Sequence, residues 1–360
     1  MSTSPAVPTV TPWRRALAIG VLVAAVVSLV VIAFTWPART SSAHDIPIAI
    51  AASAQQAQQA QQLGSSLTKG NDTFDVTRAD DRAEAVRMLE ERDVYGAVVL
   101  SAGAAPEVLT ASAASPAVAQ VMNGVATKLG AQAAAQTAQG AGGGAAAPTV
   151  SVTDVVPLSD DDPTGAGLVA AAFPLVMGGM LGGILLTFLV HGTGRRVMGL
   201  AVFVVVGGFA VAGILQGWLG ILQGPYVQNV AAFVLALGSV AATILGASTL
   251  IGRLGVSVGP VLFLLFANPI ASSATPSSFL PAPWGTIGQW FPPGAGSRLL
   301  RDISYFPDAN AAPQWLILAG WTAFGLALMG VGALLHLRRR HAHHGEHVAV
   351  REHAPDPLTV

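Results

Sequence analysis

Six stretches of the chain are apolar enough, and long enough or nearly so, to cross a lipid bilayer. A membrane-spanning helix needs about 20 consecutive, mostly apolar residues. The candidates are residues 16–36, 168–190, 197–215, 229–251, 256–270 and 314–337. The fifth is the shortest and contains Pro260 and Pro269, which a bundle tolerates because neighbouring helices can satisfy freed backbone groups. We therefore expect an all-α membrane bundle of six transmembrane helices.

The charged residues show where the chain leaves the membrane. They make up 10% of its 360 residues, against roughly 25% in soluble domains. Residues 37–165 hold 14 acidic and 7 basic residues, which is 21 of the 37, so this segment is expected to be a water-soluble insert between the first two spans. The net charge of -1 does not indicate the excess of basic residues that is typical of nucleic-acid-binding proteins. The absence of cysteine excludes disulfides and thiolate metal sites.

Basic residues in short loops predict the orientation, because they favour the cytoplasmic side. With six spans they all fall on one side: Arg14, Arg15, Arg195, Arg196, Arg253 and Arg338–Arg340. We expect a multi-pass plasma-membrane protein with residues 1–15 and the His-rich tail 338–360 in the cytoplasm, the tail arginines contacting anionic membrane lipid. The first span could instead be a cleaved signal peptide, but its apolar stretch exceeds the 7–15 residues of a signal core.

The insert is predicted to be an α/β domain. Alternating or buried apolar patterns indicate strands near 46–50, 74–76, 94–100, 108–111 and 149–158, and helices at 54–67, 81–92 and 118–138. Asp81 with Glu84 predicts a capping box. Asp162-Pro163 predicts an N-cap and a first helical proline that open the second span. Residues 140–147 contain only Gly and Ala, which is typical of a linker.

The motifs of several functional classes are missing from the sequence. The two lysines, Lys69 and Lys128, do not match a phosphate-binding loop. The spans carry no carboxylate of the kind that relays protons in coupled transporters, and no nucleophile elbow is present. We therefore expect no enzyme activity, no cofactor and no metal centre in this chain, and a pathway suited to an amphiphile better than to an ion.

Two features of the spans and loops suggest contacts. Small residues at four-residue spacing let helices approach closely, either between subunits or within one chain; they are Gly178, Gly179, Gly182, Gly183, Gly238 and Gly246. Residues 277–306 hold two amphipathic stripes, the second with Arg298, Arg301 and Asp302 on its polar side. Such elements lie in the membrane interface, here as a lid over the outer end of the bundle or as a loop anchored by tryptophans.

The order of these parts resembles the permease subunits of type 2 ABC exporters, closest to the branch of phage-infection-protein-like membrane proteins. The likeness rests on four groups of motifs, in 45–50, 96–100, 156–165 and 266–294. It implies a homo- or heterodimer, a separate ATP-binding subunit, and export of a hydrophobic or lipid-linked substrate. It also implies an outer re-entrant segment with Asn268, Pro269, Trp284, Trp290 and Phe291, and ATPase-facing loops with His191, Arg195, Arg196 and Arg253.

An alternative is a non-transporting membrane protein whose extracytoplasmic domain binds an envelope component or a partner protein. The loops at 191–196 and 252–255 are very short, whereas permeases of the family contact their ATPase through coupling helices. An ATPase that co-purifies with the chain would favour the first function over the second.

Overall fold

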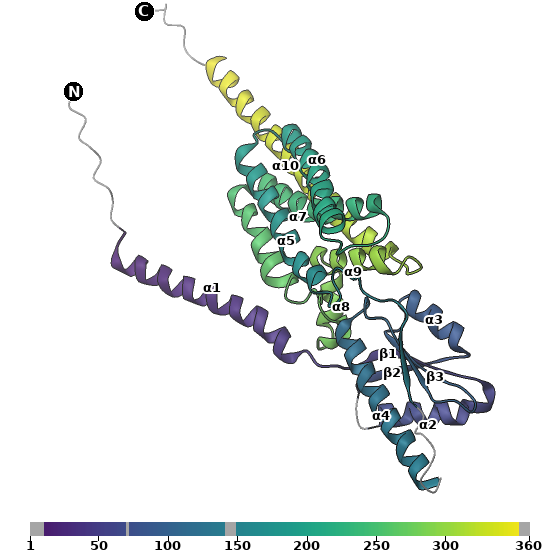
Figure 1. The fold of residues 1–360 in the computed structure, drawn as a ribbon. Helices are drawn as coiled ribbons and strands as arrows, with labels where there is room; N and C mark the ends of the chain where they lie inside the picture. The colour runs from purple at the N-terminus through teal and green to yellow at the C-terminus, as the bar shows by residue number, and fades with distance from the viewer. Residues whose placement is uncertain (1–10, 70–71, 141–148, 353–360) are drawn as a thin grey trace, which may run out of the picture.

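The computed structural model describes residues 11–69, 72–140 and 149–352. A helical bundle occupies one end of the molecule and a small sheet with three helices occupies the other (Figure 1). Within the described residues, five helices are long and apolar enough to cross a membrane. The chain is thus built as a multi-pass helical membrane protein.

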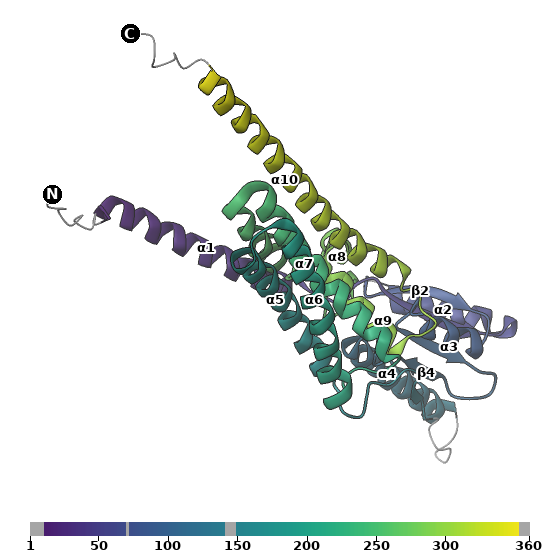
Figure 2. The same ribbon diagram turned by 90° about the horizontal axis from the view of Figure 1, so that it is seen from above.

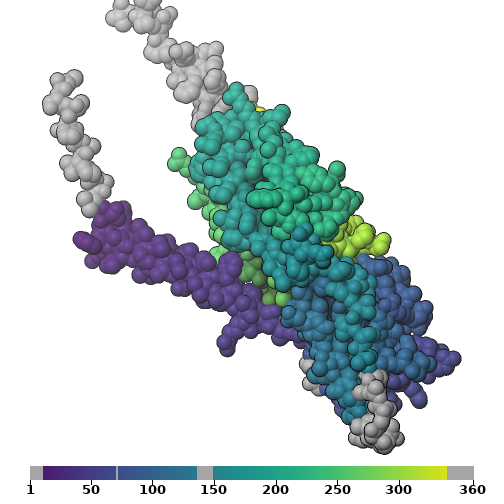
Figure 3. Space-filling view, viewed as in Figure 1, coloured from purple at the N-terminus to yellow at the C-terminus, as the bar shows by residue number. Residues whose placement is uncertain are grey.

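The bundle is arranged around α7 (Tyr226–Ile251), which is buried along most of its length. Helices α5 (Ala166–Leu189), α6 (Thr193–Ala212, extended by the π-helical turn η2, Gly213–Trp218) and α10 (Ala312–Glu352) pack around α7. Helix α1 (Trp13–Thr40) projects away from the bundle (Figure 3), and its apolar side chains are exposed. A helix with this exposure is stable only in a lipid-like solvent.

The expected span at 256–270 is not a long helix. The segment forms the 3₁₀ turns η3 (Gly252–Ser257) and the π-helical η4 (Gly259–Ala267). It folds back along α7, with Gly259 against Ile244 and with Phe263 buried in the same cluster as Val240. Glycines and Pro260 interrupt the regular hydrogen-bond ladder, which is the physical reason for the tight 3₁₀ turns of η3 and the wider π-helical turns of η4.

The helix directions place the start of α1 and the end of α10 on the side of the bundle away from the sheet. The C-terminal end of α1, the start of α5, the end of η2, and the starts of α7 and α10 all lie toward the sheet (Figures 1 and 2). The start of α1 and the end of α10 lie at the opposite end. The return of the chain through η3 and η4 is what allows α10 to start beside the sheet.

The sheet domain contains the five expected strands: β1 (Ile46–Ala52), β2 (Phe74–Ala79), β3 (Gly96–Leu100), β4 (Glu107–Thr110) and β5 (Ser151–Asp154). Their order is β2-β1-β3-β4-β5, with β4 antiparallel to β3 and the other neighbours parallel. Helix α3 (Arg82–Glu90) covers one face, while α2 (Ala57–Thr68, after the turn η1, Ala54–Gln56) and α4 (Pro116–Gly140) cover the other. The α3 face continues into the apolar core of the bundle. Most of the expected 140–147 linker lies outside the described residues.

Two predicted helix caps have different outcomes. Asp81 Oδ1 accepts from the Glu84 amide at 2.8 Å, and Glu84 Oε2 accepts from the Asp80 amide at 2.7 Å, so the predicted cap of α3 is confirmed. The prediction that Pro163 starts α5 is wrong, because Gly165 takes the N-cap position with φ of 68°. Asp162 still caps the helix, since its carboxylate accepts from the amides of Gly167 and Leu168 at 3.0 Å each.

The glycine positions pack helices within this one chain. A methyl group added at Gly183 would press on Ala241 of α7, and one added at Gly246 would overlap the carbonyl oxygen of Gly325 in α10. The other four of the six also have neighbours in this chain, which are Leu237 for Gly178, Val240 for Gly179, Phe203 for Gly182 and Thr322 for Gly238. The spacing therefore serves close approach inside the bundle.

We predict that Gly325→Ala destabilises the bundle by about 1–3 kcal/mol, because the added methyl group overlaps the α7 backbone at Ala242. Gly330→Ala, in the same helix with open space around it, is the matched control and should be neutral or slightly stabilising. Thermal unfolding in detergent measures both. Equal midpoints for the two variants would contradict this packing.

Acid should destabilise the sheet domain through Glu107. A hydrogen bond from Arg82 holds the pKa of the Glu107 carboxyl below its ordinary value. A lowered folded pKa contributes stability that is complete above the unfolded pKa and is lost as the pH falls through the folded value. We expect Glu107→Gln to flatten the decline in unfolding midpoint below about pH 4.5. An unchanged slope in this variant would show that Glu107 is not responsible.

Candidate functional site

The candidate site lies in residues 268–306, between the bundle and the sheet domain. This segment contains the turn η5 (Ser277–Phe279) and the helices α8 (Trp284–Gln289) and α9 (Pro292–Tyr305). Helix α9 is buried over most of its length and packs against α7 and α10. Helix α9 was expected in a lid on the membrane surface. It lies instead between the bundle and the sheet domain (Figure 1).

A buried ion pair joins the sheet domain to α9. Arg92 Nη1 donates to Asp302 Oδ1, and only 6% of the arginine side chain and 2% of the aspartate side chain are exposed. The guanidinium carbon of Arg92 also lies 5.4 Å from the centre of the Phe306 ring. Burial opposes the charge of Arg92, but the interactions with Asp302 and Tyr95 together outweigh it and raise the arginine pKa. An ion pair this deeply buried holds α9 and the sheet domain together, because separating the pair would leave an unpaired buried charge at a large cost in free energy.

The end of α3 aims Arg92 at this position. Arg92 follows the helix with φ of 63°, and the amides of Arg92 and Asp93 donate to the carbonyl groups of Leu89 and Met88. These two bonds define a Schellman motif, whose left-handed position glycine usually occupies. An arginine there costs roughly 1–2 kcal/mol of backbone strain, which its ion pair offsets.

Arg301, the neighbour of Asp302 in sequence, is a second buried cation. Its guanidinium donates to the carbonyl oxygens of Ser273 at 3.1 Å and of Ala114 at 3.4 Å. It thereby links α9 to the loop after η4 and to the start of α4. Burial, and then repulsion from Arg92, lower the pKa of Arg301 to about 10. It therefore remains charged at neutral pH.

Positive charge exceeds negative charge at this junction. Arg298 Nε lies 3.8 Å from Asp302 Oδ2, and 39% of its side chain is exposed. Asp302 thus pairs with two of the three guanidinium groups, those of Arg92 and Arg298, while Arg301 has carbonyl oxygens as its partners. We call Arg92, Arg298, Arg301 and Asp302 the arginine cluster. The Nε atoms of Arg92 and Arg301 are buried without a hydrogen-bond partner, beside a polar cavity of about 20 Å³ that Arg298 also lines.

A large apolar groove begins at the exposed edge of the cluster. Its volume is about 880 Å³, and it runs between α8, α9 and the first turns of α10. It shares Ser277, Gln289 and Arg298 with the polar cavity. The rest of its wall comes largely from one face of α10 and from Trp290, of which 66% is exposed; the α10 residues are Pro313, Gln314, Leu316, Ile317, Gly320, Trp321 and Phe324.

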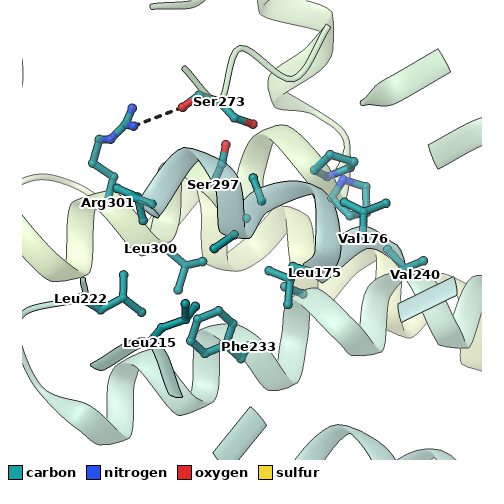
Figure 4. A pocket seen from close by; sticks show the side chains of 17 residues that line it. Leu175, Val176, Leu215, Leu222, Phe233, Val240, Ser273, Ser297, Leu300 and Arg301 are labelled. Atoms are coloured by element: carbon teal, nitrogen blue, oxygen red, sulfur yellow. Dashed lines mark hydrogen bonds between the residues drawn. The ribbon is translucent and has the colours of Figure 1, made fainter. Parts of the chain in front are cut away.

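A second cleft lies on the other side of the loop after η4. It has a volume of about 450 Å³ between α1, α5 and this loop, and Asn268 and Pro269 line it. An enclosed apolar pocket inside the bundle, shown in Figure 4, shares Ala172 and Ser273 with this cleft. Leu300 and Phe233 point into this pocket, and Arg301 with its bond to Ser273 closes one end (Figure 4).

Aromatic rings connect these parts. Trp36 at the end of α1 packs edge-on against Trp284 with ring centroids 5.8 Å apart. Phe266 lies 6.3 Å from Trp284 and 5.5 Å from Phe291, and Phe291 lies 5.6 Å from Trp321 of α10. The expected re-entrant residues Trp284 and Phe291 therefore tie α1 to the bundle, whereas Trp290 faces the groove.

The expected ATPase-facing residues lie at the opposite end of the bundle. His191, Arg195 and Arg253 are exposed there. Arg196 instead donates to the carbonyl oxygens of Val190 at 2.9 Å and Thr187 at 2.8 Å, so it closes the end of α5. The short connections from α5 to α6 and from α7 to η3 contain no separate helix of the kind that permeases use to couple to their ATPase.

The sequence predictions missed the pairing of Arg92 with Asp302, which are 210 residues apart. The available signal is the polar side of the second amphipathic stripe, an element that is predicted from the sequence to lie in the membrane interface. In the part of the chain that the structure describes, no group of three His, Cys, Asp or Glu residues is placed to hold a metal ion. No family model, curated protein or solved structure matches the chain.

We predict that Asp302→Asn lowers the free energy of unfolding by about 3–5 kcal/mol, because the buried guanidinium group of Arg92 loses its counter-charge. The matched control is Arg87→Gln in α3, whose ion pairs are exposed and contribute under about 1 kcal/mol. Unfolding in detergent, followed together with protease cleavage between sheet and bundle, measures the effect. Similar small losses in both variants would contradict a junction held by Asp302.

Proposed function

We propose that the protein is a permease subunit of an exporter for a hydrophobic or lipid-linked substrate, with ATP hydrolysed by a separate subunit. In this proposal the chain crosses the plasma membrane six times, because the η3–η4 segment returns through the bilayer beside α7. Both termini then lie in the cytoplasm and the sheet domain lies outside.

The observation that carries this proposal is the sideways opening of the bundle. The α8–α10 groove and the α1–α5 cleft both open at the end of the bundle nearest the sheet domain. The groove wall on α10 extends from Pro313 to Phe324, about 16 Å at 1.5 Å per residue. That is roughly half of the 30 Å hydrocarbon core, so the groove has the length of one leaflet. Lipid-like molecules enter a bundle by such lateral routes without passing through water.

The distribution of polar groups supports an amphiphile as cargo. Polar atoms collect at the arginine cluster, at the level of the sheet domain, while the groove below is mostly apolar. The exposed arginines Arg195 and Arg253 at the opposite end provide the surface for an ATP-binding subunit. This contact is made by short loops in place of coupling helices.

A second function is favoured by one feature of the sheet domain. Strand β2 is an edge of the sheet, and a groove of about 690 Å³ runs between β2 and the glutamine-rich α2. An unpaired edge strand beside a groove suits an added peptide strand. In this alternative the domain binds an envelope protein and nothing is transported.

Purification from native membranes distinguishes these functions. We expect an ATP-hydrolysing protein to co-purify with the wild-type chain and to be lost from the double variant Arg195→Glu/Arg253→Glu. Arg87→Glu, on the exposed face of α3, is the control and should retain the ATPase. Recovery of envelope proteins alone, lost when Thr77 of β2 is replaced by proline, would establish the alternative.

A further inference from the structure

We propose that the α8–α10 groove binds an amphiphile with an anionic head, and that the arginine cluster selects its charge. The inference rests on the proposed function, because it names the chemical class of the cargo. It concerns binding alone, so it can be tested without an ATPase or an export assay.

The charge of the head follows from the imbalance in the cluster. Arg92 and Asp302 form a nearly dry pair, which leaves Arg301 buried with carbonyl oxygens as its partners. Arg298 adds a third positive charge at the exposed edge. Buried cations without a matching anion are costly, and an anion supplied from outside would offset that cost.

Unpartnered donors indicate where the anion would act. The Nε atoms of Arg92 and Arg301 have no hydrogen-bond partner, and both residues are more than nine-tenths buried beside the polar cavity. That cavity, at about 20 Å³, has room for about one water molecule. A phosphate or carboxylate head therefore sits at its mouth, against Arg298 and Gln289, which line both spaces.

The tail follows from the shape of the groove. Leu316, Trp321 and Phe324 present an apolar wall that continues from the mouth along α10. Gly320 lies in this wall, and nothing stands within 4 Å of a methyl group added there. The groove volume of about 880 Å³ is within the range of sites that enclose ligands larger than an ion. A free inorganic anion would leave this space unused, which favours an acyl-bearing ligand.

The test uses the purified full-length chain in detergent and two lipids of identical acyl chains, phosphatidylglycerol and phosphatidylcholine. Retained lipid is counted by native mass spectrometry during titration. We expect the wild-type chain to prefer phosphatidylglycerol about tenfold, which corresponds to about 1.4 kcal/mol. Arg298→Gln should abolish the preference, while Arg195→Gln, at the other end of the bundle, should retain it.

A second variant tests the tail independently of the head. Gly320→Leu should fold and lose both lipids, because open space surrounds the position of its added Cβ and the rest of the side chain would occupy the groove. Retention of phosphatidylglycerol by both Arg298→Gln and Gly320→Leu would mean ordinary annular lipid and would overturn the inference. Inorganic phosphate that raises the unfolding temperature equally in wild type and Gly320→Leu would reveal a free-anion site and also overturn it. If lipid selection is confirmed but no ATPase co-purifies, only the exporter proposal fails.

Discussion

The organisation of this molecule depends on the cost of keeping a guanidinium group away from water. Arg92 is held in a strained backbone position at the end of α3, and its ion pair with Asp302, beside the Phe306 ring, makes its burial tolerable. That contact fixes the sheet domain to α9, and α9 is packed between α7 and α10. This ion pair between residues 210 positions apart acts together with the shared apolar core and with the bond from Arg301 to Ala114 to position the groove and the cleft relative to the sheet.

The bilayer imposes the second constraint. Helices α5, α6 and α10 surround α7, and glycines let their backbones approach without a large apolar side chain between them. The aromatic contacts from Trp36 to Trp321 complete the bundle at one end. At that end the molecule leaves apolar space and excess positive charge side by side, a combination that suits molecules with an oily tail and a charged head.

Local patterns were sufficient to place most elements. The alternation of Ile46, Ile48 and Ile50 and the capping residues Asp81 and Glu84 act within a few positions, so the strands and helices of the insert could be located from sequence. The segment 256–270 was harder, because hydrophobicity indicates burial but does not reveal that Gly259 and Pro260 turn it into a short π-helical return. The helices that pack against the glycines could not be predicted either, because four-residue spacing indicates close approach but does not identify the neighbouring helix.

The arginine cluster lay beyond sequence reasoning for a different reason. A polar stripe on an amphipathic helix usually faces water. The residues next to Arg301 and Asp302 in the sequence do not indicate that a second domain covers them. Only the tertiary fold brings Arg92 and the loop at Ser273 to α9. The groove likewise depends on three helices whose contacts are set by the whole fold.

The most direct test of the account is membrane topology, and the absence of cysteine makes it simple. Single cysteines at Gln59 of α2, at Asp308 between α9 and α10, and at Arg253 after α7 are all at exposed positions. In intact cells an impermeant maleimide should label the first two, and it should label Arg253→Cys only after the membrane is opened. Labelling of Asp308→Cys and Arg253→Cys from the same side would contradict the return of the chain through the bilayer.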